Sequence, residues 1–503
     1  MLRTRARQSG LALAALSLAA LSLVGGAARG TAHAAPVFHP TVSDYAQLTS
    51  STTPPTESQC ESAGRRCFTP QSVRAAYNLA PLYSSGLDGT GVTIAVVDSF
   101  GSDTITHDLH VYDQAFGLPP LCGEEGVTCA PGMPTFSQYH FENAAPPTKA
   151  GPGKSPGQED RSAWAIETSL DVETAHAIAP GANILLVTTP TAETLGVQGL
   201  PPMMAAEQYV IDNHLADVIS QSFGTAEDAF SSTASLQNLR YAFVSAKQHN
   251  VTVLASSGDF GSAGVLKQPV GGPNAQPLLP NPTVGWPASD PLVTGVGGTY
   301  LCTDPTSTTT RTVDSVDPPT NCQNNPGQAE VGWIDSGGGF SHVFTRPGFQ
   351  DTLPAGSTAI PPTARGVPDI GLQASARTGA LVYVSLPGPG DSGLFCGNSP
   401  CSTGWYDIGG TSLSCPQWAG IVAIADQANG GRLGYINPAL YAMAADPSRY
   451  ANDFYDVTVG NNGAFAPTVP GYSASPGWDP VTGLGTPNAA QLVPDLVAAV
   501  HSS

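Results

Sequence analysis

The chain has 503 residues and is acidic, with 39 Asp and Glu against 19 Lys and Arg and a formal net charge of −20. A surface of this sign repels nucleic acid and anionic membranes, so neither is expected as a partner. The length is sufficient for one large core or two domains, and 56 glycines and 46 prolines predict many tight loops.

The first 35 residues have the pattern of a secretory signal. Arg3, Arg5 and Arg7 precede an apolar run at 11–24, and small residues lead to a cleavage site near Ala35. A membrane anchor is the alternative interpretation, but a run of about 14 residues is shorter than the roughly 20 that span a bilayer. We therefore expect 1–35 to be a signal peptide and the protein to be secreted and extracellular.

Residues 36–66 are rich in Pro, Ser and Thr and predict a short, poorly ordered leader. No further boundary is visible, so we expect 67–503 to form a single domain. Apolar runs typical of strands buried on both faces lie at 92–100, 182–189, 216–224 and 251–259. Helical patterns lie at 162–179, 203–213, 235–250 and 488–500. This alternation predicts an α/β fold, a doubly wound and mainly parallel sheet with helices on both faces and the functional site at the carboxyl ends of the strands.

Eight of the nine cysteines lie in close pairs, which in an exported chain indicates local disulfides. The pairs are Cys60 with Cys67, Cys122 with Cys129, Cys302 with Cys322, and Cys396 with Cys401. Cys415 is left over, and we expect a buried, unpaired thiol in a helix rather than a reactive one.

Ser412 follows two glycines and begins an apolar, helix-like run, which is typical of a nucleophilic hydroxyl presented at a turn. Such a serine needs a base. A subtilisin-type peptidase carries a histidine base in an HGT-like turn at a helix start, and none of the ten histidines has that context. His176, flanked by alanines on the 162–179 helix, is the nearest candidate.

The same helix offers a pair of carboxylates. Glu167 and Asp171 are four residues apart, so they share one helical face. A solvated acidic face is the alternative, but the neighbouring residues are mostly apolar. Two carboxylates held close together share a proton, and such a pair serves as a general base in acid. Asp259, at the end of the 251–259 strand, is either a turn cap or, when protonated, a donor to a developing oxyanion.

Together these motifs resemble the sedolisin family of serine-carboxyl peptidases, acid-acting endopeptidases with a subtilisin-like fold. The resemblance covers residues 67–495 and rests on five motifs in the family's order. They are ETSLDVETAHAIAPGA with Glu167 and Asp171, SSGD with Asp259, SGGGFS at 336–341, GGTSLSCP with Ser412, and DVTVGNNG with GWDPVTGLGTP. It implies that Ser412 is the nucleophile and Glu167 its base. It further implies that Asp171 orients Glu167 and that Asp259 helps to bind the oxyanion beside the Ser412 N–H.

The resemblance also implies one structural calcium ion in the C-terminal loops. The carboxylates of Asp456 and Asp479 would bind it together with the backbone carbonyls of Val457, Ser475 and Gly477. Hard oxygen ligands of this kind suit Ca²⁺, and the alternative is two turn aspartates in a glycine-rich loop.

Two stretches are candidates for binding the substrate backbone by strand addition, 220–224 and the SSGD strand end. Ser222 and Gly224 are the candidate substrate-binding residues, with ordinary strand-to-loop chemistry as the alternative.

Two features depart from the family pattern. Members usually carry a large N-terminal prodomain, for which 36–66 leaves no room, so we expect folding without one, a separate chaperone chain, or inhibition by neutral pH alone. In addition, Ser375 and Ala376 stand where the family often has Asp-Pro.

The sequence therefore predicts a secreted, acid-acting serine endopeptidase that hydrolyses proteins or peptides through an acyl-enzyme and is monomeric. Two alternatives remain open. One is a His-dependent subtilisin-like peptidase with His176 as base. The other is a catalytically silent, calcium-stabilised binding protein on the same scaffold.

Overall fold

In a computed structural model, contacts divide the chain into the units Met1–Ala35 and Pro36–Ser503. The structure describes residues 44–143, 158–190, 197, 199–265, 278–306, 322–388, 391–396 and 399–502. The predicted signal and the first part of the predicted leader lie outside the described residues, and their assignments stay predictions. Within the described residues, no helix is long and apolar enough to cross a membrane.

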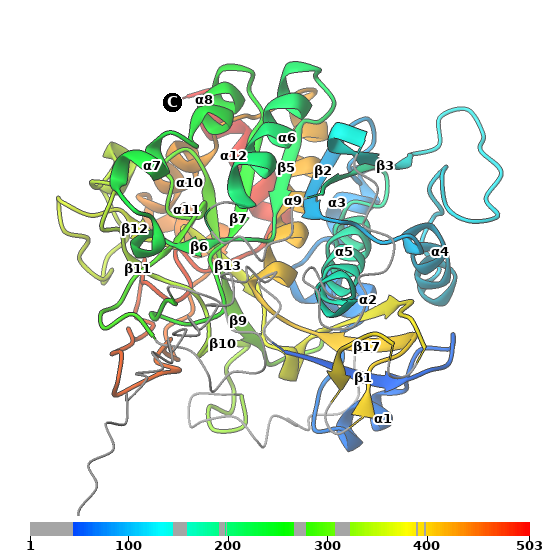
Figure 1. The fold of residues 1–503 in the computed structure, drawn as a ribbon. Helices are drawn as coiled ribbons and strands as arrows, with labels where there is room; N and C mark the ends of the chain where they lie inside the picture. Colours follow the sequence, from blue (N-terminus) through cyan, green and yellow to red (C-terminus); the bar gives the residue numbers. More distant parts are fainter. Residues whose placement is uncertain are drawn as a thin grey trace, which may run out of the picture. The chain divides into compact units, whose positions relative to one another are not determined.

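An eight-stranded sheet forms the centre of the Pro36–Ser503 unit (Figure 1). Its path runs β10-β9-β7-β5-β2-β4-β3, with β13 also paired to β9. All pairings are parallel except β10 with β9. The strands are β2 (Thr93–Ser99), β3 (Phe136–His140), β4 (Asn183–Thr189), β5 (Val218–Gln221), β7 (Thr252–Ser256), β9 (Thr294–Leu301), β10 (Glu330–Gly332) and β13 (Ile370–Gln373). The predicted mainly parallel sheet is confirmed.

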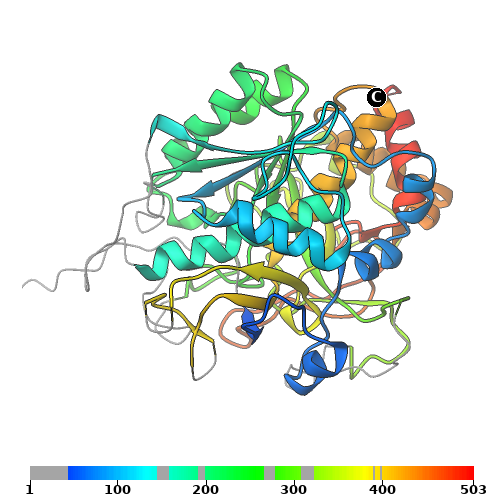
Figure 2. The same ribbon diagram turned by 90° about the vertical axis from the view of Figure 1, so that its right-hand side faces the viewer.

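Helices cover both faces of this sheet, as predicted (Figure 2). In β2, Ile94 and Val96 belong to the core shared with α5 (Gln158–Ile178) and α9 (Thr411–Asn429), because alternate side chains of a strand point to opposite faces. The intervening Ala95 and Val97 pack in the core with α6 (Leu200–Asp212) and α8 (Tyr241–Gln248). Both faces are therefore apolar, which explains why the strands read as continuous apolar runs.

The remaining elements surround this framework. The predicted 235–250 helix is interrupted and forms α7 (Thr233–Gln237) and α8, because the chain turns at Arg240 and its guanidinium binds Asp290. The predicted C-terminal helix is confirmed as α12 (Ala489–Val500) and packs on α9. The other helices are α1 (Glu57–Ser62), α2 (Pro70–Ala76), α3 (Ala80–Ser84), α4 (Ile105–Phe116), α10 (Asn437–Ala444) and α11 (Pro447–Asp453). Two-stranded pairs form between β6 (Thr225–Ala226) and β8 (Gly285–Trp286), β11 (Gly339–Phe340) and β12 (Gly366–Val367), β15 (Phe395–Cys396) and β16 (Ser399–Pro400), and β18 (Phe454–Tyr455) and β19 (Thr486–Pro487).

A second, three-stranded antiparallel sheet has the order β1-β17-β14. Its strands are β1 (Tyr45–Thr49), β14 (Ala380–Val384) and β17 (Gly404–Ile408). The expectation of a poorly ordered leader is therefore wrong for residues 44–66, which contain β1 and α1. Backbone pairing with β17 and the Cys60–Cys67 disulfide order this segment despite its polar composition.

The four predicted disulfides are present, and Cys415 is free and buried as predicted. Its thiol lies 3.4 Å from the Ser220 hydroxyl, and burial raises the pKa of the thiol to about 12. A thiol with this pKa is protonated at physiological pH and is not a nucleophile.

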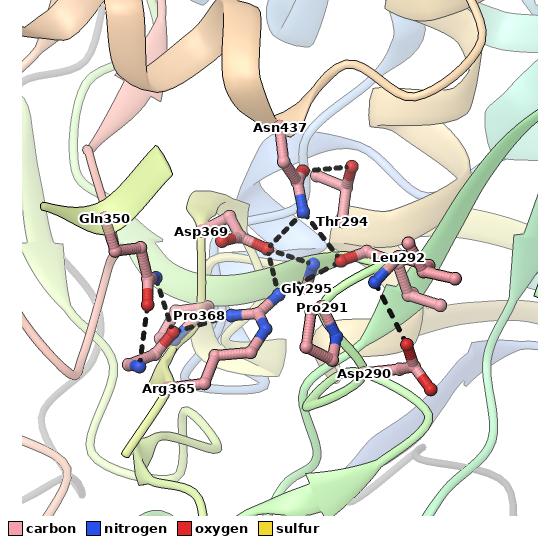
Figure 3. A network of polar contacts seen from close by, with 12 residues as sticks. Asp290, Pro291, Leu292, Thr294, Gly295, Gln350, Arg365, Pro368, Asp369 and Asn437 are labelled. Carbon is pink, nitrogen blue, oxygen red and sulfur yellow. Dashed lines mark hydrogen bonds and ion pairs between the residues drawn. The ribbon is translucent and has the colours of Figure 1, made fainter. Parts of the chain in front are cut away.

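A fully buried ion pair ties three segments together (Figure 3). Arg365 donates to Asp369 Oδ2 at 2.6 Å and to the carbonyl oxygen of Val293 at 3.0 Å. Asp369 also accepts from the Gly295 N–H at 2.8 Å and from the Tyr441 hydroxyl at 3.0 Å. This network joins the start of β9, the loop before β13 and helix α10.

Candidate active site

The four predicted catalytic residues come from three elements that meet at the carboxyl side of the sheet. Glu167 and Asp171 lie on α5, Asp259 follows β7, and Ser412 is the second residue of α9. Helices α5 and α9 pack against each other. All four residues are buried, Asp259 with 6% exposure and the others with none.

Glu167 is placed to interact with the nucleophile candidate. Burial raises the pKa of Glu167 well above its usual value, and the charge of Asp171 raises it further. The nearby Ser412 hydroxyl offsets part of this rise, because a donor beside the carboxyl favours its ionised form. The shared helical face predicted from the spacing is therefore a buried face directed at Ser412, and the solvated acidic face is excluded.

Asp171 lies next to a third carboxyl that the sequence did not single out. Its pKa is raised well above the usual value by burial and then by the charge of Asp98, while the Ser222 hydroxyl donates to its Oδ1 at 3.0 Å. Asp98 is the penultimate residue of β2 and accepts a 3.1 Å hydrogen bond from the Thr168 hydroxyl. Burial raises the pKa of Asp98 to about 7.

Asp98 sits where the strand order reverses. β2 is flanked by β4 on one side and β5 on the other, so the carboxyl end of β2 is the switch point of the sheet. The sequence feature that could have identified Asp98 is a carboxylate at the end of a buried strand. The same feature identified Asp259. No spacing in the sequence links Asp98 to the helix that carries Glu167.

Asp259 is held against the turn that precedes Ser412. Its Oδ1 accepts from both the N–H and the hydroxyl of Thr411, each at 2.8 Å. Its charge also contributes to the raised pKa of Glu167, which places it beside the carboxyl pair. The aspartate caps a turn and lies next to the nucleophile candidate, so the two sequence interpretations are compatible.

Two glycines shape the turn into α9. Gly410 has φ 128°, a conformation that side chains disfavour, and its N–H bonds the Ala374 carbonyl oxygen at 2.6 Å. A Cβ at Gly409 would lie 2.1 Å from the Ala376 nitrogen. Ser375 and Ala376, the departure from the family pattern, therefore lie in the backbone against which this turn packs.

The candidate substrate-binding residues lie beyond the end of β5. Ser222 is buried and bonds Asp171, and Gly224 precedes β6, which pairs with β8. Strands β5 and β7 have neighbours on both edges, so strand addition is possible only on the backbone beyond their carboxyl ends. The role of Ser222 and Gly224 in substrate binding stays a prediction.

His176 is bound elsewhere. Its Nε2 lies 3.1 Å from Asp113 Oδ2 and 3.0 Å from the Pro119 carbonyl oxygen, and the side chain is fully buried. It is nine residues beyond Glu167 on α5, which places it about 13 Å farther along the helix axis. His176 is therefore not the base for Ser412 in this arrangement.

The predicted calcium ligands converge on one turn. Asp456 accepts from the Gly477 N–H at 3.0 Å, and Asp479 accepts from the Ser475 N–H at 3.1 Å. Burial raises the pKa of Asp456, and it raises the pKa of Asp479 to about 7. Two carboxylates that bond the same 475–477 turn, with the Val457 carbonyl next to Asp456 in sequence, form a donor set whose chemistry fits a hard divalent cation. Among the described residues, no group of three or more His, Cys, Asp or Glu is placed to hold a metal ion, so backbone carbonyls would have to complete the site.

Comparison with known proteins places the chain in a family. The model of the subtilase family matches residues 157–440. Kumamolisin from Bacillus sp. (strain MN-32) is 29% identical over 449 residues, which are 89% of this chain and 67% of kumamolisin. Tripeptidyl-peptidase 1 from Homo sapiens is 30% identical over 364 residues, which are 68% of this chain but only 53% of that protein. This chain therefore spans about half the length of the tripeptidyl-peptidases that it matches.

Among solved structures, Pseudomonas sedolisin, a serine-carboxyl proteinase complexed with two molecules of pseudo-iodotyrostatin, aligns with a TM-score of 0.59. The identity is 24%, and the alignment covers 87% of this chain and 99% of that chain.

The chain belongs to the subtilase family, which the family model matches over more than half of its length. Within it, the predicted resemblance to the sedolisin family and the subtilisin-like fold are both confirmed by these relatives.

Proposed function

We propose that the protein is a secreted serine-type endopeptidase that acts in acid, with Ser412 as nucleophile and Glu167 as base. The observation that carries this proposal is the interaction of the Ser412 hydroxyl with a fully buried Glu167 whose neighbour is a second carboxyl, Asp171. The substrates are proteins or peptides, and the working form is a monomer.

The reaction follows from the positions of these groups. Ser412 Oγ attacks the carbonyl carbon of the substrate while its proton passes to Glu167. Glu167 then gives that proton to the leaving amine as the carbon–nitrogen bond breaks. Water hydrolyses the resulting ester by the same route in reverse, which releases the acid product and regenerates Ser412.

Asp171 and Asp259 have supporting roles. Asp171 shares a proton with Glu167, because two ionised carboxylates in one buried site are too costly. Asp259, in its protonated form, donates to the oxyanion together with the Ser412 N–H at the N-terminus of α9, where the helix dipole also favours negative charge. Both roles require a protonated carboxyl and therefore an acidic solution. In such a solution a histidine would be protonated and could not act as a base.

The test is hydrolysis of casein from pH 3 to pH 9 by the wild type and by Ser412→Ala, Glu167→Gln and His176→Ala. We expect an optimum below pH 6 and loss of activity in the first two variants. An alkaline optimum together with inactivity of only the His176 variant would favour the histidine-dependent alternative. Binding of casein without hydrolysis would favour the silent binding protein.

The endopeptidase assignment needs its own experiment, because the chain is also similar to tripeptidyl-peptidase 1. An internally quenched peptide with a blocked N-terminus is compared with the same peptide bearing a free amine. An endopeptidase cleaves both at similar rates. Cleavage only of the free form, three residues from its end, would contradict the proposal.

We further propose that Asp456 and Asp479 hold one structural Ca²⁺ with the carbonyls of Val457, Ser475 and Gly477. The ion would neutralise two crowded carboxylates and fix the loop between β18 and β19. Titrating Ca²⁺ into chelator-treated protein should raise the melting temperature, since an ion that binds only the folded state stabilises it. The increase should be absent in Asp479→Asn, and an unchanged wild-type melting temperature would refute the site.

A further inference from the structure

The segment 44–67, which contains β1 and α1, is bonded to the backbone next to the nucleophile candidate. Strand β1 pairs with β17, the strand that leads into the Gly409 and Gly410 turn. Immediately before β1, the Asp44 carbonyl oxygen accepts the Gly409 N–H at 3.1 Å. The segment therefore holds the residue three positions before Ser412.

Arg65 connects this segment to both sides of the turn. Its guanidinium donates to Asp44 Oδ1 at 2.9 Å and to the Ala376 carbonyl oxygen at 2.8 Å. The same side chain lies 3.6 Å from the carboxylate of Asp407, on β17. Arg65 is 7% exposed and Asp407 is fully buried, so the guanidinium provides a counter-charge inside the protein.

Each residue of the turn is held by a different neighbour. Gly409 bonds Asp44, Gly410 bonds Ala374, and Thr411 bonds Asp259. Arg65 binds the first of these supports through the side chain of Asp44, and it binds the backbone two residues beyond the second through the carbonyl of Ala376. Movement of Arg65 would loosen Asp44 and Ala376 on one side of the turn and leave the bonds to Ala374 and Asp259.

We propose that Arg65, together with Asp44, is a positioning residue that fixes Ser412 against Glu167 through the Gly409 and Gly410 turn. The working enzyme therefore retains this segment. The expected change in kcat rests on the proposed function. Amide hydrogen exchange tests the same inference without reference to activity.

The experiment compares Arg65→Ala with Arg66→Ala, a matched variant on the same segment. Arg66 is equally buried, but its guanidinium binds the Cys302 carbonyl oxygen and the ring of Phe68, away from the turn. We expect Arg65→Ala to lower kcat by about 10–100-fold with KM little changed, since small misplacements of reacting groups have effects of this size. Arg66→Ala should leave kcat within about twofold.

Hydrogen exchange of the folded variants provides the second readout. Peptides covering 404–413 should exchange about tenfold faster in Arg65→Ala, because local opening of the turn becomes easier, while peptides covering β5 stay unchanged. Arg65→Lys keeps the charge but cannot donate from two nitrogen atoms at once, so its kcat and exchange rates should lie between those of the wild type and Arg65→Ala. This variant replaces Arg65→Ala if the alanine variant does not fold.

The outcomes separate the two proposals. A wild type that hydrolyses no peptide refutes the proposed function, and the exchange measurement still decides the coupling. An active wild type whose Arg65→Ala variant matches Arg66→Ala in both kcat and exchange overturns the positioning role. Recovery of active enzyme that begins after residue 67 would overturn it as well.

Discussion

Two groups of fully buried acidic side chains are held in opposite ways in this protein. Asp369 is paired with Arg365 and accepts the Gly295 N–H (Figure 3). It also accepts a hydrogen bond from the Tyr441 hydroxyl. Glu167 and Asp171 face each other with no cation among the causes of their raised pKa values. A buried charge that is paired stabilises one conformation, whereas carboxyls crowded together bind protons strongly and become available for proton transfer.

The largest expected effect comes from removing the proton acceptor. Glu167→Gln keeps the shape of the side chain but cannot take the Ser412 proton, and general-base assistance is worth about 10²–10⁴-fold in rate. We expect kcat on a blocked peptide to fall by at least this factor at the optimum pH. The substitution removes a buried ionisable group, so the melting temperature at neutral pH should not fall. A large loss of stability would show that Glu167, like Asp369, is held as a charge by stabilising partners.

The second prediction concerns pH and stability. Burial raises the pKa of Asp98 to about 7, of Asp108 to about 6 and of Asp426 to about 8. These values exceed the unfolded values near 4, so the folded protein binds more protons between about pH 4 and pH 8. Stability is therefore highest in acid and falls as pH rises through the folded values, by about 1.4 kcal/mol per pH unit for each group in its window.

Calorimetry at pH 4.5, 6.0 and 7.5 with constant Ca²⁺ measures this trend. A melting temperature that rises from pH 4.5 to pH 7.5 would contradict the prediction.

The third prediction breaks the paired group. Arg365→Met leaves Asp369 buried without its counter-charge, which typically costs about 3–5 kcal/mol. Arg346→Met is the matched control, because Arg346 and Asp351 form an exposed pair at 2.9 Å and such pairs contribute about 0–1 kcal/mol. Denaturant unfolding should separate the two variants clearly, and kcat of folded Arg365→Met should stay near that of the wild type. Equal stability of the two variants would show that the buried pair adds nothing.

Sequence reasoning predicts candidate site residues where the chemistry has a local signature. A spacing of four on a helix placed Glu167 and Asp171 on one face, and a glycine turn before a helix singled out Ser412 as the nucleophile candidate. The pairing of β1 with β17 was not predictable in this way, because strands of five residues about 360 positions apart leave no spacing to detect. Asp98 was missed for a related reason, since its proximity to Asp171 arises only when β2 and α5 pack together.

The smallest expected effect on activity comes from a buried carboxyl without a hydrogen-bond partner. Glu207 on α6 is fully buried, neither oxygen has a hydrogen-bond partner, and burial alone raises its pKa well above the usual value. Glu207→Gln is isosteric and removes only the ionisation, so it should stabilise the protein at pH 7.5 by up to about 1.4 kcal/mol per pH unit above the unfolded value near 4.3. At pH 4 the two proteins should unfold alike, and activity should be the same. Because Glu207 resembles Glu167 in burial but lacks a nucleophile beside it, an unchanged kcat would show that burial and a raised pKa alone do not make a carboxyl catalytic. Equal stability at both pH values would show instead that Glu207 is hydrated in solution.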